Sequence, residues 1–184
     1  MENSKYISSL KKTPFQGLKK VFRNHFPFIL LLFVLCIGLI FPYLHSGLIY
    51  SNYDWSFYAN RVEEIYDNLK AGHLFTFIGA HNFGHTGSGN FLFYPTLFLY
   101  PWALLRFVFN PITSFYIWLF LFFAVSCLIA YGCMYAFSKS RLQGFIFSLL
   151  YVFAPMSFIY ALGIFDLGEF IGEAFLPLIF LGAY

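Results

Sequence analysis

Asp54, Asp166 and Glu169 are the residues of this sequence best placed to do chemistry. Only eight of the 184 residues are acidic, and a charged side chain beside a long apolar segment is costly, so such a residue usually has a function. Together the three carboxylates could hold Mg²⁺ or Mn²⁺ against a phosphate leaving group. One of them could instead act as a general base toward a hydroxyl. The alternative is that Asp54 only caps a helix and the other two are solvated.

Two arginines add a possible anion site to these acids. Arg61 lies seven residues after Asp54, two helical turns along nearly the same face, where a guanidinium could clamp a phosphate. It could equally pair with Glu64 at i+3. Arg106 follows in the same inter-span segment and is a second candidate for substrate binding.

His81 and His85 stand four residues apart, a spacing at which two histidines on a helix can share one metal ion. Glycines at 79, 84, 87 and 89 favour a loop here instead. The two side chains are therefore candidates for contact with headgroups or phosphates, with unpartnered surface histidines as the alternative.

The element that must position Asp54 is an amphipathic helix predicted over residues 54–71. Apolar side chains recur at spacings of three and four, and acidic or basic residues fill much of the rest. Asp54 stands at the N-cap position, and Gly72 follows the last turn. The apolar stripe comprises Trp55, Tyr58, Val62, Ile65 and Leu69.

Composition places this helix in an integral membrane protein. The chain is 60% hydrophobic, 24% aromatic and 10% charged, whereas soluble domains average about 25% charged residues. Cys36, Cys127 and Cys133 all lie in apolar runs without metal-binding or disulfide spacing, which predicts packing roles. The fold class expected is all-α and polytopic.

Basic residues predict the topology. Residues 1–25 carry six lysines and arginines against one acid, so they stay in the cytoplasm and span 26–44 is an uncleaved signal anchor. Lys139 and Arg141 also lie inside, so span 112–137 runs inward and span 143–163 runs outward. The outer loop, 45–111, then contains helix 54–71 and a second helix, 95–109, lying at the interface.

This topology brings Asp54, Asp166, Glu169 and Glu173 to the outer face. A fourth span begins near Ala174 and is incomplete, because eleven residues are about half a crossing. The chain is therefore expected to be an N-terminal fragment of a longer protein.

The run of residues 54–61, DWSFYANR, followed by Ile65, Leu69, Gly72 and Phe93-Tyr94-Pro95, resembles the first outer loop of certain bacterial membrane proteins. These are the 6-pyruvoyl-tetrahydropterin-synthase-related and YfhO-like membrane proteins, which are similar to the GT-C glycosyltransferase superfamily. In that superfamily one acid follows the first span and another lies in the second outer loop. Asp54 and Asp166 match these two positions.

The resemblance implies a GT-C-like membrane glycosyltransferase of the bacterial cytoplasmic membrane. Such an enzyme uses a polyprenyl-phosphate-linked sugar at the outer face to modify a cell-envelope polymer, with Asp54 and Asp166 as catalytic residues. Membrane lipid and lipid-linked sugar are the expected partners, and nucleic acid is not. The alternative function is a non-catalytic flippase, transporter or scaffold of the same architecture.

The predicted topology can be tested by thiol labelling. A cysteine at Asn68 should react with an impermeant reagent added outside intact cells, and one at Ser140 should react only after the membrane is opened. Labelling of the Ser140 position from outside would overturn the outer-face assignment.

Overall fold

The computed structural model describes residues 14–49, 54–80 and 86–184, with side chains described from residue 24 onward. These residues form helices, with a β-bridge between Gly79 and Ser88. In chain order the helices are α2 (Pro14–Ser46), α3 (Trp55–Lys70), α4 (Asn90–Phe93), η1 (Leu97–Leu99), α5 (Tyr100–Leu105), α6 (Pro111–Ser138), α7 (Arg141–Val152), α8 (Pro155–Phe158), η2 (Ile159–Gly163) and α9 (Leu167–Ala183).

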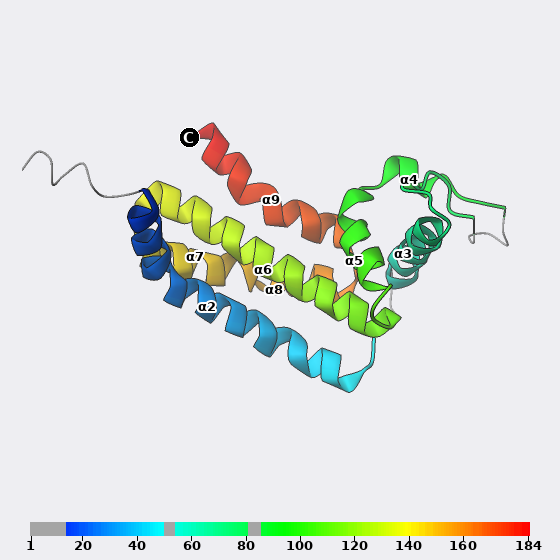
Figure 1. Ribbon diagram of the computed structural model, residues 1–184, viewed down its shortest axis with the longest axis horizontal. Helices are drawn as coiled ribbons and strands as arrows, with labels where there is room; N and C mark the ends of the chain where they lie inside the picture. Colours follow the sequence, from blue (N-terminus) through cyan, green and yellow to red (C-terminus); the bar gives the residue numbers. More distant parts are fainter. Residues whose placement is uncertain (1–13, 50–53, 81–85) are drawn as a thin grey trace, which may run out of the picture.

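Helix α6 is the centre of the molecule, because α2, α5, α7 and α9 all pack against it (Figure 1). Asn110 caps its first turn by accepting from the Thr113 amide at 2.9 Å, and Pro111 fits the first helical position, where no amide donor is needed. Lys139 ends the helix in the left-handed conformation, and Ser140 caps α7. A two-residue turn thus folds α7 back along α6.

Short helices gather at one end of this bundle. In Figure 1, α3, α4 and α5 lie together beside the first turns of α6, at the end opposite the α6–α7 turn. We call this end of the bundle, formed by α3, α4, α5 and the first turns of α6, the α3 end. The segment predicted as one helix, 95–109, contains the shorter η1 and α5, since α5 ends at Leu105 and a turn follows. It packs against α3 and the first part of α6 and lies at the α3 end.

Two helices are long and apolar enough to cross a membrane: residues Asn24–Ser46 of α2, and α6. Helix α7 with the α8–η2 segment would form a third span, bent by 46° at the break. These helices indicate a membrane protein. Large apolar side chains on their outer surfaces, such as Leu150 at 73% exposed, agree with contact to lipid.

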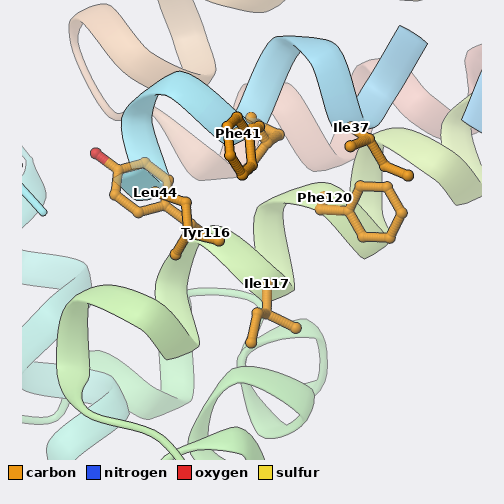
Figure 2. A pocket seen from close by; sticks show the side chains of 7 residues that line it. Ile37, Phe41, Leu44, Tyr116, Ile117 and Phe120 are labelled. Atoms are coloured by element: carbon orange, nitrogen blue, oxygen red, sulfur yellow. The ribbon is translucent and has the colours of Figure 1, made fainter. Parts of the chain in front are cut away.

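The α2–α6 pair leaves an apolar hollow of about 230 Å³ on its surface (Figure 2). Ile37, Phe41 and Leu44 of α2 face Tyr116 and Phe120 of α6 across it. The Tyr116 hydroxyl has a hydrogen-bond partner, because it donates to the Leu48 carbonyl at 2.6 Å. A surface without free polar groups is what contact with hydrocarbon requires.

Helix α9 begins at Leu167, earlier than the span predicted from about residue 174. Asp166 caps it by accepting from the Glu169 amide at 3.2 Å. Glu169 and Glu173 therefore lie on the helix itself and not in a loop before it. A prediction from hydrophobicity alone places the start of α9 too late, because acidic residues occupy the first two turns of this helix.

The α6–α7 contact depends on a glycine. A Cβ atom at Gly144 would lie 3.0 Å from the Tyr131 carbonyl oxygen, whereas one at Gly132 would meet nothing within 4 Å. Gly144→Ala should therefore lower the stability by about 1–3 kcal/mol, because the two backbones must separate. Gly132→Ala should not lower it, since alanine is the better helix former.

Thermal unfolding of both variants in the same detergent checks this. A melting temperature for Gly144→Ala at or above that of Gly132→Ala would contradict the close packing of α6 and α7.

Candidate functional site

Trp55 fixes the first turn of α3. Its ring lies 4.8 Å from that of Phe115 on α6, 5.3 Å from that of Phe165 before α9, and 5.6 Å from that of Trp102 on α5. Such offset and edge-to-face aromatic pairs add stability beyond the area they bury. The Trp55 side chain thus joins four segments at the α3 end: α3 itself, α5, α6 and the loop before α9.

Asp54 stands directly before this anchored turn. Its backbone amide donates to the Ile164 carbonyl at 3.3 Å, which ties it to the loop that carries Asp166. Asp54 occupies the N-cap position of α3, yet within the described chain its side chain makes no capping hydrogen bond. The residue is exposed. The carboxylate is therefore available for a role other than capping.

Tyr58 makes the second link between α3 and the loop of Asp166. Its hydroxyl accepts from the Gly168 amide in the first turn of α9 at 3.0 Å, and the residue is buried. Burial raises the pKa of this phenol, the Gly168 hydrogen bond and Arg61 oppose the rise, and Asp166 and Asp54 add to it. Tyr58 is thus a neutral residue that lies near both acids.

Asp166 and Glu169 lie one turn apart at the start of α9, as their spacing predicted. Asp166 is partly exposed and Glu169 is exposed. Among the described residues, no three His, Cys, Asp or Glu side chains are grouped so that they could hold a metal ion. Metal binding by Asp54, Asp166 and Glu169 stays a prediction.

Arg61 is fully buried. Its Nη2 donates to the Tyr94 and Pro95 carbonyls at 3.2 and 3.5 Å and to Thr96 Oγ1 at 3.0 Å. Within the described chain, its hydrogen bonds therefore join α3 to the segment before η1, and none of them goes to Glu64. The rings of Phe57, Tyr58, Phe91 and Tyr94 surround its Cζ at 5.2 to 5.9 Å.

Two further nitrogens of Arg61, Nε and Nη1, are buried and have no hydrogen-bond partner in the described part of the chain. Burial lowers the pKa of this guanidinium, against the opposing effect of Tyr58 and Tyr94. Aromatic faces stabilise a cation in place of water. A phosphate would have to reach Arg61 past these rings, so phosphate binding by Arg61 stays a prediction.

Arg106 has a structural partner. Its Nε and Nη2 donate to the two carboxylate oxygens of Glu63 at 2.7 and 3.2 Å, and Nη1 donates to the Phe109 carbonyl at 3.0 Å. This two-point pair clamps the end of α5 to α3. Substrate binding by Arg106 stays a prediction, as does substrate binding by His81 and His85, which lie outside the described residues.

The sequence analysis did not identify the roles of Trp55 and Tyr58 in holding the two acid-bearing loops together. Both were recognised only as members of the apolar stripe of helix 54–71. The periodicity that placed them there indicates which face is buried and not which segment covers it. Only the fold shows that the covering segment carries Asp166.

Comparison with protein-family models gives no match, and neither do comparisons with curated proteins and with solved structures.

Replacing Arg61 tests its structural role. Arg61→Met should lower the stability by about 1–3 kcal/mol, because the Tyr94 to Thr96 segment loses a charged donor. Lys70→Met is the matched control, since Lys70 is an exposed cation at the end of the same helix. It should change stability by less than about 1 kcal/mol, because its ammonium lies over the Tyr66 ring at 4.3 Å at an exposed site.

Melting temperatures of the two variants in one detergent give the comparison. Equal stability of Arg61→Met and Lys70→Met would mean that Arg61 contributes nothing to holding α3 in place.

Proposed function

We propose that this chain forms part of a membrane glycosyltransferase that uses a polyprenyl-phosphate-linked sugar at the outer face of a bacterial cytoplasmic membrane. Asp54 is its general base and Asp166 is the second acid of the site. One observation carries the proposal: an exposed carboxylate opens α3 without capping it, beside the loop of a second acid. The resemblance of residues 54–61 to the first outer loop of GT-C proteins supports the same assignment.

The reaction needs little beyond a base and a place for the lipid carrier. Asp54 would take the proton from an acceptor hydroxyl as the oxygen attacks the anomeric carbon. The bond between that carbon and the phosphate oxygen breaks, and the polyprenyl phosphate leaves with the electron pair. No step in this scheme is assigned to a metal ion.

The place of the site suits a lipid-linked substrate. The α3 end adjoins the first turns of α6 and the last turns of α2, the two candidate spans (Figure 1). A carrier chain lying in the hydrocarbon beside these helices would present its phosphate near their ends. Exposed aromatic and aliphatic side chains at this end, including Phe93 and Leu97, fit an interfacial position.

The test is transfer by membranes that contain the protein, supplied with a panel of labelled polyprenyl-phosphate sugars and cell-envelope acceptor. Asp54→Asn should reduce transfer at least 100-fold, because the amide cannot accept the proton. Folding should be unchanged, since the carboxylate makes no capping bond. Asp67→Asn changes an exposed acid on the same helix and should retain activity.

Full transfer by Asp54→Asn would reject the base role. Equal losses of transfer in Asp54→Asn and Asp67→Asn would mean that a change of surface charge, and not loss of a base, lowers the activity. Transfer from no sugar carrier of the panel by the unsubstituted protein would reject the glycosyltransferase assignment.

A further inference from the structure

Two buried cysteines meet between the two candidate spans. The sulfur atoms of Cys36 on α2 and Cys127 on α6 lie 3.9 Å apart, and the two residues are 0% and 1% exposed. They are 91 residues apart in the sequence, so only the packing of α2 against α6 brings them together. Both are free thiols, as is Cys133, which is buried further along α6.

The pair lies near the middle of both helices. Cys36 lies twelve residues after Asn24, in a candidate span of 23 residues. Cys127 lies sixteen residues after Pro111, about 24 Å along α6 at the helical rise per residue. In a chain whose α2 and α6 cross the membrane, both thiols are therefore at the depth of the hydrocarbon, away from reagents dissolved in water.

The surroundings of the pair are apolar. Leu32 and Ile40, one turn before and one turn after Cys36, are both buried and belong to the same core as the two cysteines. A charged group in such surroundings is costly, because nothing replaces its hydration. Any reaction of the two thiols is therefore favoured if it leaves both sulfur atoms uncharged.

Formation of a disulfide meets this condition. A disulfide holds its two sulfur atoms at about 2.05 Å, so the sulfur atoms of Cys36 and Cys127 must close from 3.9 Å. Each sulfur is placed by one torsion, about the bond between Cα and Cβ, and rotation about these two bonds moves the sulfur atoms relative to each other. The resulting bond would join α2 to α6 covalently.

The apolar hollow between α2 and α6 lies beside the pair (Figure 2). Ile37, which follows Cys36 directly in the chain, and Ile40 line it from α2. Phe120, about two turns before Cys127, lines it from α6. A neutral molecule dissolved in the bilayer can enter this hollow of about 230 Å³, whereas its apolar lining disfavours a charged one.

We propose that Cys36 and Cys127 are a redox-active dithiol that a lipid-soluble quinone oxidises to a disulfide. Both S–H bonds break, an S–S bond forms between the two residues, and two protons and two electrons reduce the quinone to the hydroquinone. Reactants and products are all uncharged, as the apolar surroundings favour. The dithiol is separate from the α3 end and does not depend on the proposed transferase activity.

The test is treatment of the purified full-length protein, in phosphatidylcholine vesicles, with decylubiquinone. The protein is then denatured, alkylated and weighed by mass spectrometry. Untreated protein should take up three alkyl groups, one for each cysteine. Treated protein should lose the mass of two hydrogens and take up a single alkyl group, at Cys133. One hydroquinone should form per chain, and dithiothreitol should restore the full alkylation.

Cys133→Ala is the matched control, because it removes the other buried cysteine of α6 and leaves the pair intact. It should reduce the quinone at the rate of the unsubstituted protein, whereas Cys36→Ala and Cys127→Ala should not reduce it. Oxidised glutathione, which is charged, should oxidise the pair at least tenfold more slowly than the quinone.

Full alkylation of the quinone-treated unsubstituted protein would overturn the proposal. Reduction of the quinone by Cys36→Ala, or equal rates with oxidised glutathione and quinone, would overturn it as well. If Cys36→Ala does not fold, a digest of the treated unsubstituted protein decides, since it must contain a disulfide-linked pair of peptides with Cys36 and Cys127.

Discussion

The packing of Trp55 against three aromatic rings is the interaction on which the α3 end depends. Those rings belong to α5, α6 and the loop before α9, so one side chain holds together four segments that are up to 110 residues apart. The Asp54 amide and the Tyr58 hydroxyl then bond to Ile164 and Gly168. Without the aromatic contacts, nothing in the local sequence would bring Asp54 beside the loop of Asp166.

Asp54 is an acid placed without the partner that would normally explain its position. It stands at the start of α3, and within the described chain its side chain makes no capping hydrogen bond. The residue is exposed, so keeping its carboxylate charged costs little. Glu173, in contrast, accepts a hydrogen bond from the Ser157 hydroxyl. The lack of a capping bond is why chemistry on a substrate is proposed for Asp54.

Composition and periodicity predicted much of the fold. Apolar composition predicted a helical membrane protein, and two helices of spanning length are present. The 3.6-residue period placed a helix at 54–71, where α3 runs from Trp55 to Lys70. These features are local, so the sequence determines them directly. The predicted GT-C architecture, the number of spans and the orientation in the membrane remain predictions.

Features that depend on tertiary contacts were not predictable in the same way. The burial of Arg61 follows from the segment 94–96 folding over it, which no spacing along α3 reveals. The acids of α9 were assigned to a loop because an apolar window excludes them, whereas capping by Asp166 starts the helix before them. The hydrogen bond from Ser157 to Glu173 depends on how α8 lies against α9. Each is a contact between segments, and a single sequence does not specify the partner.

The central claim is that the loops of Asp54 and Asp166 lie side by side at one end of a spanning bundle, and cross-linking in the membrane tests it most directly. Cysteines at positions 54 and 166 should be joined in high yield by a bifunctional thiol reagent with a reach of about 10 Å, since the Asp54 amide bonds to Ile164. Cysteines at 54, directly before α3, and at 140, in the α6–α7 turn, should not be joined, because α3 lies at the end of α6 opposite that turn (Figure 1). Cross-linking of the second pair and not the first would contradict the account.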